Sequence, residues 1–320
     1  MLTTLRHLPL RPPTQALRNA RLYTTQINQQ SLDQWIAEPK RLVLEDTVHP
    51  ERLADLYITL PTRDGIRKPF HEPLKSQPLG YGHHIAFFHF LTPESELRSD
   101  GTDGEFCPPE PFSRRMWASG KMTWDPENPM LIGEKAHATW TVDSVEKKGF
   151  EKGRPMLFVN KKIEFTMTGK DQPSFVEERV HVYLPGDAHA SGRVNREVKD
   201  IPSSSDFVYE FTPSLTTLFR FSALMWNAHH IHLDKDYSVV KEGYPERLVH
   251  GPLTSLMLLE GLVDHKPDAQ IHTFEYMARN PLIVGRKLAV RGHWKDKKTA
   301  SLWCVDESGV VGMTGKVKLV

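Results

Sequence analysis

Cysteine is scarce in this sequence. Among the 320 residues only Cys107 and Cys304 occur, far apart and in no Cys-x-x-Cys pair. Small folds that depend on disulfides, and zinc sites built from cysteine pairs, need more cysteines at closer spacing. The sequence therefore indicates neither a disulfide framework nor a cysteine-rich metal site, and it fits a reducing compartment.

Long apolar runs and excess charge are also missing. No stretch approaches the roughly 20 apolar residues that a helix needs to cross a bilayer. Lysine and arginine together number 41, aspartate and glutamate 40, so the formal net charge is only +1. This balance gives no broad basic surface for a nucleic acid. We expect neither a membrane nor a nucleic acid as a partner.

Acidic residues are absent from the first 32 positions, where Asp33 is the first carboxylate to appear. The same segment contains threonines and four arginines, Arg6, Arg11, Arg18 and Arg21. Arginine-rich, acid-free N-termini are typical of mitochondrial transit peptides. We interpret residues 1–32 as a disordered transit peptide cut near Tyr23, and we expect the mature protein in the mitochondrial matrix.

What the chain does contain is an internal repeat. "NPMLIGEK" begins at Asn128 and "NPLIVGRK" begins at Asn280. An apolar segment precedes each copy, over residues 82–91 and 252–263, and both segments are predicted helices. The first spacing is longer by an insertion rich in proline, glycine and acids, residues 92–111. Its composition predicts a mobile, solvated loop.

Strand signals follow each copy of the repeat. Alternating apolar and polar residues predict half-buried antiparallel strands over residues 135–145, 156–168 and 175–183, and again over 288–294, 300–306 and 310–319. Each half of the chain thus consists of a helix followed by a strand meander, with residues 186–206 as the linker.

The segment "GPLTSLMLLEGLV" indicates the fold class. Glu260 is its only charged residue, so this helix has to be buried on nearly every face. An antiparallel sheet wrapped round a buried helix is a hotdog, and two such halves make an α+β double hotdog. We expect a degenerate N-terminal hotdog over 33–185 and a catalytic C-terminal hotdog over 207–320.

Two motifs carry a resemblance to a known family. "FSALMWNAHHIHLDKDY", followed by "GYPERLVHGPL", resembles the hydratase-2 motif S-G-D-x-N-P-L-H of MaoC-like double-hotdog enzymes. "PPEPFSRRMWASGKMTW" looks like a segment of the branch that holds fungal mitochondrial 3-hydroxyacyl-thioester dehydratase type 2 and bacterial mesaconyl-C4-CoA hydratase. The resemblance covers roughly residues 33–320.

The resemblance implies a hydro-lyase that needs no cofactor and no metal. Its substrates would be (3R)-3-hydroxyacyl thioesters of acyl carrier protein or CoA, dehydrated reversibly to trans-2-enoyl thioesters in mitochondrial type II fatty-acid synthesis. A mesaconyl-C4-CoA-type hydratase is the alternative. Acyl chain length, the choice between carrier protein and CoA, and whether the chain forms a homodimer are left open.

The motif's histidine falls on His232 and its aspartate on Asn227. Imidazole titrates at about 6.5, so one histidine can take the C2 proton and then protonate the leaving hydroxyl. An amide carries no proton at neutral pH, so Asn227 is left to orient water or the 3-hydroxyl. With His232 alone titrating, we predict one limb of activity at about pH 6–7. Gly251, at the start of the buried helix, offers its N–H as an oxyanion hole.

The remaining candidates are assigned to substrate binding. His229 is expected to hold the active-site loop, with His250 beside Gly251. Arg114, Arg115 and Trp117 are candidates for the pantetheine or carrier phosphate, because arginine binds phosphate in a bidentate manner. An arginine pair at the start of a strand is equally typical of a salt-bridged surface. The first half lacks the Asn-x-x-x-x-His pattern, so we expect one active site per chain and room for the acyl chain in that half.

Two other classes of function stay open at this point. If His230 and His232 lie in a strand, their side chains point the same way and could chelate zinc or iron, as in cupin-like proteins. Asp234 or His250 would be the third ligand. Alternatively, Asn227 marks the decay of catalysis, and the chain binds acyl thioesters without turning them over. Metal analysis and a turnover assay distinguish these classes.

Overall fold

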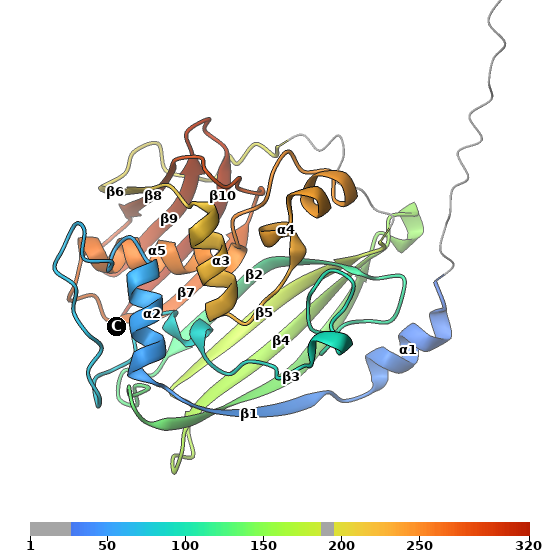
Figure 1. Cartoon of the computed structure of the whole chain (residues 1–320), viewed down its shortest axis with the longest axis horizontal. Coiled ribbons are helices and arrows are strands. Elements are labelled where there is room, and N and C mark those ends of the chain that lie inside the picture. Colours follow the sequence, from blue (N-terminus) through green and yellow to red (C-terminus); the bar gives the residue numbers. More distant parts are fainter. Residues whose placement is uncertain (1–26, 187–194) are drawn as a thin grey trace, which may run out of the picture.

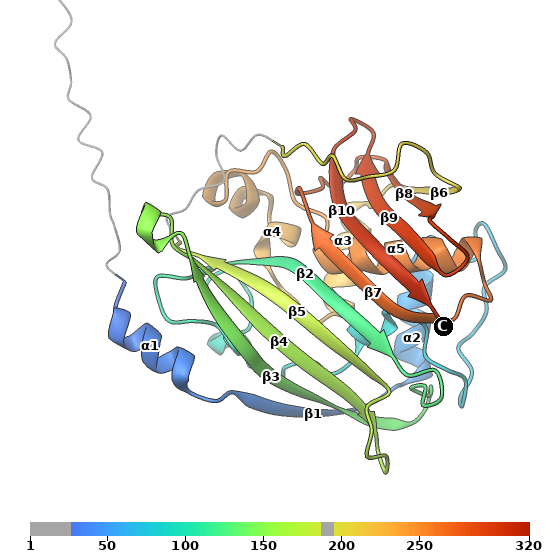
Figure 2. The ribbon, with the colours of Figure 1, turned by 180° about the vertical axis from the view of Figure 1, so that it is seen from behind.

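One antiparallel sheet contains every strand of the described residues. The computed structural model describes residues 27–186 and 195–320. The strand order is β1-β3-β4-β5-β2-β7-β10-β9-β8-β6 (Figures 1 and 2). The strands are β1 (Arg41–Thr47), β2 (Arg114–Trp124), β3 (Lys135–Lys148), β4 (Met156–Met167), β5 (Phe175–Leu184), β6 (Phe207–Phe211), β7 (Ile271–Ala278), β8 (Leu288–Trp294), β9 (Thr299–Asp306) and β10 (Val311–Leu319).

The seam between β2 and β7 divides this sheet into two halves. Strands β1 to β5 come from the first half of the chain and β6 to β10 from the second. Across the seam, β2 pairs with β7 from Ser119 opposite Met277 to Thr123 opposite Thr273. The six predicted strands, now β3, β4, β5, β8, β9 and β10, are confirmed with ends shifted by at most three residues.

Helix α5 (Gly251–His265) lies against the second half of the sheet, where it contacts β6, β8, β9 and β10 (Figure 1). Every residue from 252 to 262 is buried, as its nearly continuous apolar sequence requires. Gly261 allows close contact with β8, because a Cβ atom there would lie 2.7 Å from Val290 Cγ1. The predicted helix over 252–263 is therefore confirmed.

The predicted helix over 82–91 is wrong. Only the 3-10 turn η1 (His83–Ala86) forms, and the chain then leaves through an extended Phe87 and through Phe88 at a φ of +59°. Two buried carboxylates of other elements hold this turn. His83 Nε2 lies 2.8 Å from Glu260 Oε1 on α5, and His84 Nε2 lies 3.0 Å from Glu177 Oε2 on β5. These long-range contacts outweigh local helix propensity.

The other helices flank the sheet. Helices α2 (Pro50–Thr59) and α3 (Leu215–Leu224) contact each other, and α3 contacts the short helix α4 (His230–Leu233). Figure 1 shows α2, α3 and α5 on one side of the sheet, while Figure 2 shows the opposite side. The short turns are η2 (Glu94–Glu96), η3 (Phe150–Lys152) and the π-helical η4 (Tyr237–Lys241).

Helix α1 (Gln29–Ala37) begins the described chain's regular structure. Asn28 caps it by accepting a hydrogen bond from the Ser31 N–H. Its Leu32 is buried in a small cluster with Phe112 and Tyr183. Residues 28–32 of the segment interpreted as a transit peptide are thus part of the folded chain. Residues 1–26, with the predicted cut near Tyr23, lie outside the described residues.

The two Asn-Pro copies have the same local structure. Leu131 and Ile283, each three residues after its asparagine, form isolated bridges with Pro78 and Leu248. Gly133 and Gly285 follow at φ values of +88° and +79°, before strands β3 and β8 begin. Positive φ is the reason that glycine stands at both positions. The repeat in the sequence is therefore a repeat in the structure.

Candidate active site

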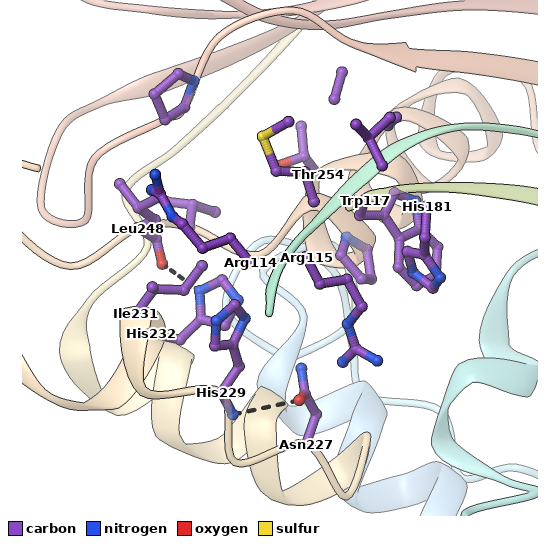
Figure 3. Close-up of a pocket in the computed structure, with 18 of the residues that line it drawn as sticks. Arg114, Arg115, Trp117, His181, Asn227, His229, Ile231, His232, Leu248 and Thr254 are labelled. Atoms are coloured by element: carbon purple, nitrogen blue, oxygen red, sulfur yellow. Dashed lines mark hydrogen bonds between the residues drawn. The ribbon is translucent and has the colours of Figure 1, made fainter. Parts of the chain in front are cut away.

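A cavity of about 1380 Å³ lies between the two halves of the sheet and their helices. The predicted site residues that line it are Asn227, His229, His232, Gly251, Arg114, Arg115 and Trp117. They come from β2, from the start of α5, from the segment joining α3 to α4 and from α4 itself (Figure 3). One predicted residue, His250, is completely buried and is not among the lining residues. The structure thus gathers seven of the eight candidates around one cavity.

His232 is fixed in one tautomer. Its Nδ1 lies 2.8 Å from the carbonyl oxygen of Leu248 (Figure 3). A carbonyl can only accept, so Nδ1 carries the proton and Nε2 keeps its lone pair. Burial lowers the pKa of His232 to about 4; the Leu248 carbonyl opposes this shift, and the charge of Arg115 adds to it. The ring of His232 is therefore neutral at physiological pH, and its pKa lies below the 6–7 expected from the sequence.

His250 supports His232 from behind. The two rings stack with centroids 3.7 Å apart, and His250 Nε2 lies 2.8 Å from the hydroxyl oxygen of Ser222 on α3. Burial, and then the neighbouring His232 and His229, hold the pKa of His250 well below its usual range. The uncharged ring of His250 therefore packs against His232 and restrains its orientation. The expected direct contact with substrate is replaced by this supporting role.

Asn227 and His229 shape the opposite side of the site. The chain leaves α3 through Trp226, whose φ is +52°, and Asn227 Oδ1 then accepts a hydrogen bond of 3.3 Å from the His229 N–H (Figure 3). The amide oxygen is thereby occupied, which directs the two N–H donors of Asn227 elsewhere. His229 Nε2 lies 3.8 Å from Asp100 Oδ2. Burial lowers the pKa of His229 well below its usual range.

The insertion over residues 92–111 is not a solvated loop, contrary to the sequence-based expectation. Asp100, Gly101 and Thr102 are buried, and the Asp100 carbonyl accepts a hydrogen bond of 2.9 Å from the His230 N–H. A Cβ atom on Gly101 would lie 2.3 Å from the Ala228 carbonyl oxygen. The middle of the insertion therefore packs on the catalytic segment and closes one side of the site.

Gly251 opens helix α5 with its N–H unused. No hydrogen bond among the described residues involves that N–H, as expected in a first helical turn. The backbone at Gly251 does not require glycine, and an added Cβ would lie 3.5 Å from Trp117 Cβ, an ordinary contact. The missing side chain therefore leaves space on the cavity side, where a substrate carbonyl can approach the donor and the positive end of the helix dipole.

The two arginines of β2 have different surroundings. Arg114 forms an ion pair with Glu242, which fits the salt-bridge interpretation. Arg115 is half-buried; desolvation acts to lower its pKa, but Tyr183, Cys107 and Asp100 raise it on balance. Its side chain extends from β2 toward the part of the cavity that contains Asn227 (Figure 3).

Trp117 forms part of the cavity wall between Gly251 and the first half of the sheet. Its ring stacks with Tyr276 at a centroid distance of 6.3 Å and meets His181 edge-on at 5.4 Å. The guanidinium carbon of Arg179 lies 4.1 Å from its centroid. These contacts leave Trp117 as an apolar wall, fixed on its other sides by the sheet.

The first half has no equivalent of the catalytic helix start. In the first half, the Leu79 N–H donates a hydrogen bond to the Met130 carbonyl. In the second half, the Val249 N–H donates the corresponding bond to the Leu282 carbonyl, and this correspondence aligns the two copies. On this alignment Gly80 occupies the position of His250. The ring of His83 fills the space beside Gly80, since a Cβ there would lie 2.3 Å from His83 Nδ1. These substitutions favour one active site per chain.

The metal-site alternative rested on a strand that does not exist. Residues 230–233 form helix α4, so His230 and His232 do not share a face as they would two apart in a strand. The His230 ring packs edge-on against Tyr237 instead, at 5.2 Å. Within the part of the chain that the structure describes, no three His, Cys, Asp or Glu side chains are grouped to hold a metal.

Several functional contacts were missed from the sequence. Ser222 and the Leu248 carbonyl fix the two stacked histidines, and Asp100 contacts His229 from a loop more than a hundred residues away. The sequence positions of these residues do not indicate that such distant partners meet.

Among the described residues, none of the helices has the length and apolar character that a membrane-spanning helix requires.

Comparison with known proteins gives a consistent result. The family model of hydroxyacyl-thioester dehydratase type 2 matches residues 82–284. The chain is 32% identical over 219 residues to mesaconyl-C(4)-CoA hydratase of Chloroflexus aurantiacus, a match covering 68% of this chain and 75% of the relative. It is 28% identical over 247 residues to the mitochondrial hydroxyacyl-thioester dehydratase type 2 of Schizosaccharomyces pombe, covering 69% and 79%.

Solved structures show the same fold. A MaoC-like dehydratase from Phytophthora capsici superimposes with a TM-score of 0.65 at 14% identity, covering 92% of this chain and 99% of that one. The α+β double hotdog predicted from the buried helix and the strand meanders is confirmed. The resemblance carried by the His232 and Arg114 segments is confirmed as well.

Proposed function

We propose a reaction for this chain, which belongs to the hydroxyacyl-thioester dehydratase type 2 family and is a hydro-lyase. It dehydrates (3R)-3-hydroxyacyl thioesters reversibly, with His232 as the catalytic residue. The products are trans-2-enoyl thioesters and water. The observation that carries this proposal is the fixed tautomer of His232, whose Nδ1 is held by Leu248 while the ring lines the cavity.

Dehydration begins at C2 of the substrate. Nε2 of His232 takes the C2 proton, and the electrons of the broken C–H bond move onto the thioester oxygen. The N–H of Gly251 donates a hydrogen bond to the enolate oxygen that forms, a contribution typically worth about 10²- to 10³-fold in rate. The negative charge of the enolate stabilises the adjacent imidazolium.

The second half of the reaction expels water. The enolate electrons return to form the C2=C3 double bond, and the C3–O bond breaks. His232 gives its proton to the departing oxygen, so the leaving group is water and the imidazole becomes neutral again. A low intrinsic pKa makes the imidazolium a strong acid for this step. Asn227, with its oxygen bound to the His229 N–H, donates to the 3-hydroxyl and orients it.

The pathway and location are further parts of the proposal. We place the enzyme in mitochondrial type II fatty-acid synthesis, acting on thioesters of acyl carrier protein or CoA. The support is the arginine-rich, acid-free N-terminus and the similarity to the mitochondrial hydroxyacyl-thioester dehydratase type 2 of Schizosaccharomyces pombe. Mature protein isolated from mitochondria should begin near Thr24. Peptide mapping that recovers residues 1–15 in that protein would contradict this location.

A substrate panel tests the reaction. Purified residues 24–320 should interconvert 3-hydroxyacyl and trans-2-enoyl thioesters of C4 to C10 without added metal, followed by enoyl-thioester absorbance in both directions. His232→Ala should lower kcat/KM by on the order of 10²-fold or more. The matched control is His230→Ala, because the His230 side chain packs on Tyr237 and is not among the cavity-lining residues. Absence of turnover for the whole panel would overturn the proposed function.

A further inference from the structure

Trp117 borders the space that Gly251 leaves open. The pairing of β2 with β5 shifts its register between Trp117 and Ser119, so β2 has an extra residue there. Such a bulge turns the neighbouring side chains and is frequent beside active sites. The three atoms nearest to a Cβ built on Gly251, at 3.5–3.6 Å, all belong to Trp117. A thioester carbonyl that approaches the Gly251 N–H is therefore bounded on one side by this indole ring.

Arg179 holds the Trp117 ring from β5. Its guanidinium carbon lies 4.1 Å from the Trp117 centroid and 5.0 Å from the Trp140 centroid. Both distances are within the roughly 6 Å over which a cation is attracted to an aromatic face. Arg179 is itself only 9% exposed. The Trp117 ring is thus fixed by a buried cation, and this cation comes from the half of the chain that lacks the proposed catalytic residues.

Glu177 sets the orientation of Arg179. Arg179 Nε donates to Glu177 Oε1 at 2.8 Å and Nη2 donates to Oε2 at 2.7 Å, and this two-pronged contact fixes the plane of the guanidinium. Burial alone would raise the pKa of Glu177, but Arg179 and then His84, whose Nε2 lies 3.0 Å from Oε2, lower it to about 2. The carboxylate therefore stays ionised and holds the cation over Trp117 in one orientation.

Stability alone does not account for this buried pair. Ion pairs inside proteins add little net stability, because removing two charges from water costs about as much as their attraction contributes. A well-packed apolar pair would hold β5 at least as well. Glu177 Oε1 also lies 3.5 Å from the hydroxyl of Tyr276 on β7, so the pair reaches across the seam into the second half of the sheet. Its location points to a role beside the proposed oxyanion hole.

We propose that Arg179 is a positioning residue for the reaction. Clamped by Glu177, it holds Trp117 so that the thioester carbonyl lies in line with the Gly251 N–H. The inference rests on the proposed function, because it uses the same reacting centre. In this role Arg179 touches no reacting atom and transfers no proton. Its effect falls on kcat, since a displaced carbonyl still binds but forms a weaker hydrogen bond as the enolate develops.

A second buried cluster of the same residue types provides the control. Arg63 donates to the buried Glu260 at 2.8 Å, and its guanidinium carbon lies 4.6 Å from the Tyr57 centroid. His83 Nε2 lies 2.8 Å from the other oxygen of the same carboxylate. Neither Arg63 nor Tyr57 is among the cavity-lining residues. Replacing Arg63 therefore disturbs a comparable network without moving the wall beside Gly251.

A conservative replacement separates positioning from stability. Arg179→Lys keeps a positive charge beside Glu177 but loses the two-pronged contact, and Arg63→Lys is the same replacement in the control cluster. Thermal melts should show a loss of stability in both variants. On crotonyl-CoA, Arg179→Lys should reduce kcat about 10-fold with KM changed by less than about threefold, whereas Arg63→Lys should keep wild-type kinetics. If Arg179→Lys does not fold, the double variant Glu177→Gln/Arg179→Met replaces it, because it leaves neither charge unpaired.

A double-mutant cycle tests whether Arg179 acts through Trp117. In a Trp117→Phe background the indole that Arg179 holds is already absent. Arg179→Lys should therefore lower kcat by less than about twofold in that background, against about 10-fold in the wild-type background. Equal fold-losses in the two backgrounds would show that Arg179 acts independently of the indole ring, and the proposal would be wrong.

The carbonyl group of a bound thioester gives an independent readout. Butyryl-CoA has no 3-hydroxyl group and no double bond, so it binds without reacting. With an isotope label on its thioester carbonyl, difference infrared spectra report the hydrogen bond that this carbonyl accepts. Binding to wild type should lower the stretching frequency. Gly251→Ala should remove most of that shift and Arg179→Lys should reduce it, whereas Arg63→Lys should leave it unchanged.

The outcomes separate this inference from the proposed function. If wild type hydrates crotonyl-CoA and Arg179→Lys retains both kcat and the carbonyl shift, the function stands and the positioning role is wrong. If wild type turns over no thioester but shifts the butyryl-CoA carbonyl in a manner that depends on Arg179, the function is wrong and the positioning role stands. A carbonyl that does not shift on binding to wild type would overturn the positioning role.

Discussion

The imidazole of His250 stacks on that of His232, with the centroids 3.7 Å apart and the planes inclined by 26°. Ser222 holds His250 from α3 through a contact of 2.8 Å, and Leu248 holds His232 at the same distance. The ring of His232 is therefore restrained within its plane by the hydrogen bond to Leu248 and perpendicular to its plane by the stacked His250. We therefore expect Ser222, which is not among the lining residues, to act as a positioning residue in the proposed reaction.

Ser222→Ala should therefore lower kcat more than it changes KM. The substitution leaves His250 Nε2 buried without its partner, which should cost about 1–3 kcal/mol of stability. A looser ring should reduce kcat by about 10-fold, because misplacing a catalytic group lowers the fraction of reactive geometries. Ser255→Ala is the control, since that hydroxyl is also buried but bonds to the Pro252 carbonyl within α5. Steady-state kinetics and urea denaturation measure both effects, and equal kcat values for the two variants would contradict the positioning role.

Gly251→Ala should lose activity without losing stability. The added methyl would lie 3.5 Å from Trp117, so the fold accommodates it, but it occupies the approach to the Gly251 N–H. We expect kcat/KM to fall on the order of 10²-fold, the scale of one lost oxyanion donor. Gly261→Ala on the same helix should instead lose stability without losing activity, because its Cβ would lie 2.7 Å from Val290 Cγ1. A Gly251→Ala enzyme with wild-type kinetics would remove this glycine from the oxyanion hole.

Activity should depend on pH through one ionisation near 4. Burial lowers the pKa of His232 to about 4, and the neutral ring is the proposed active form. We therefore expect kcat/KM to rise with pH through that value and then to stay flat. Asn227→Asp would place a carboxylate near the ring, raise its pKa and shift the limb upward. Initial rates on crotonyl-CoA from pH 3.5 to 9, with each enzyme diluted into the assay from neutral buffer, measure both. A wild-type limb at 6–7 would mean that the ring is more hydrated than the structure indicates.

Stability should fall between pH 6.5 and 4.5. Burial lowers the pKa values of six histidines: His83, His89, His181, His229, His232 and His250. Below pH 6.5 these histidines bind protons in the unfolded chain but stay neutral in the folded chain. The free energy of unfolding is therefore highest above pH 6.5 and decreases as the pH falls. His232 alone accounts for on the order of 3 kcal/mol once the pH is below its folded value.

Thermal melts at pH 7.5, 5.5 and 4.5 test this expectation. The buried carboxylates act in a lower window, because nearby cations hold the pKa of Glu177 at about 2 despite its burial. They therefore contribute little to the change above pH 4.5. A Tm that stays constant from pH 7.5 to 4.5 would show that the buried histidines remain hydrated.

The sequence predicts the second half of the fold well. The apolar run around Glu260 predicts α5, and the strand signal over 288–294 predicts β8 with both ends correct. These elements depend on local patterns of burial, which are visible residue by residue. His232 and Gly251 follow from the motif that surrounds them, and Asn227 from its spacing.

The sequence predicts the first half less well. Alternation on β5 marks two faces but does not say which face is inside, and here the polar set containing Arg179 and His181 is buried. The turn at His83 depends on Glu260, which is 177 residues away. The buried position of Asp100 likewise depends on His230, and composition alone indicates solvent. In each case a distant partner determines the conformation.

Pairing of β2 with β7 has a consequence for how such an enzyme changes over generations. The residues proposed to make and break bonds are encoded after position 220, whereas Trp140, Arg179 and His181, which line the same cavity, are encoded before position 185. The shared sheet brings both sets to one cavity without linking their sequences. Selection can therefore retune what the enzyme accepts by altering one stretch of the gene, while the stretch encoding the chemistry is inherited unchanged.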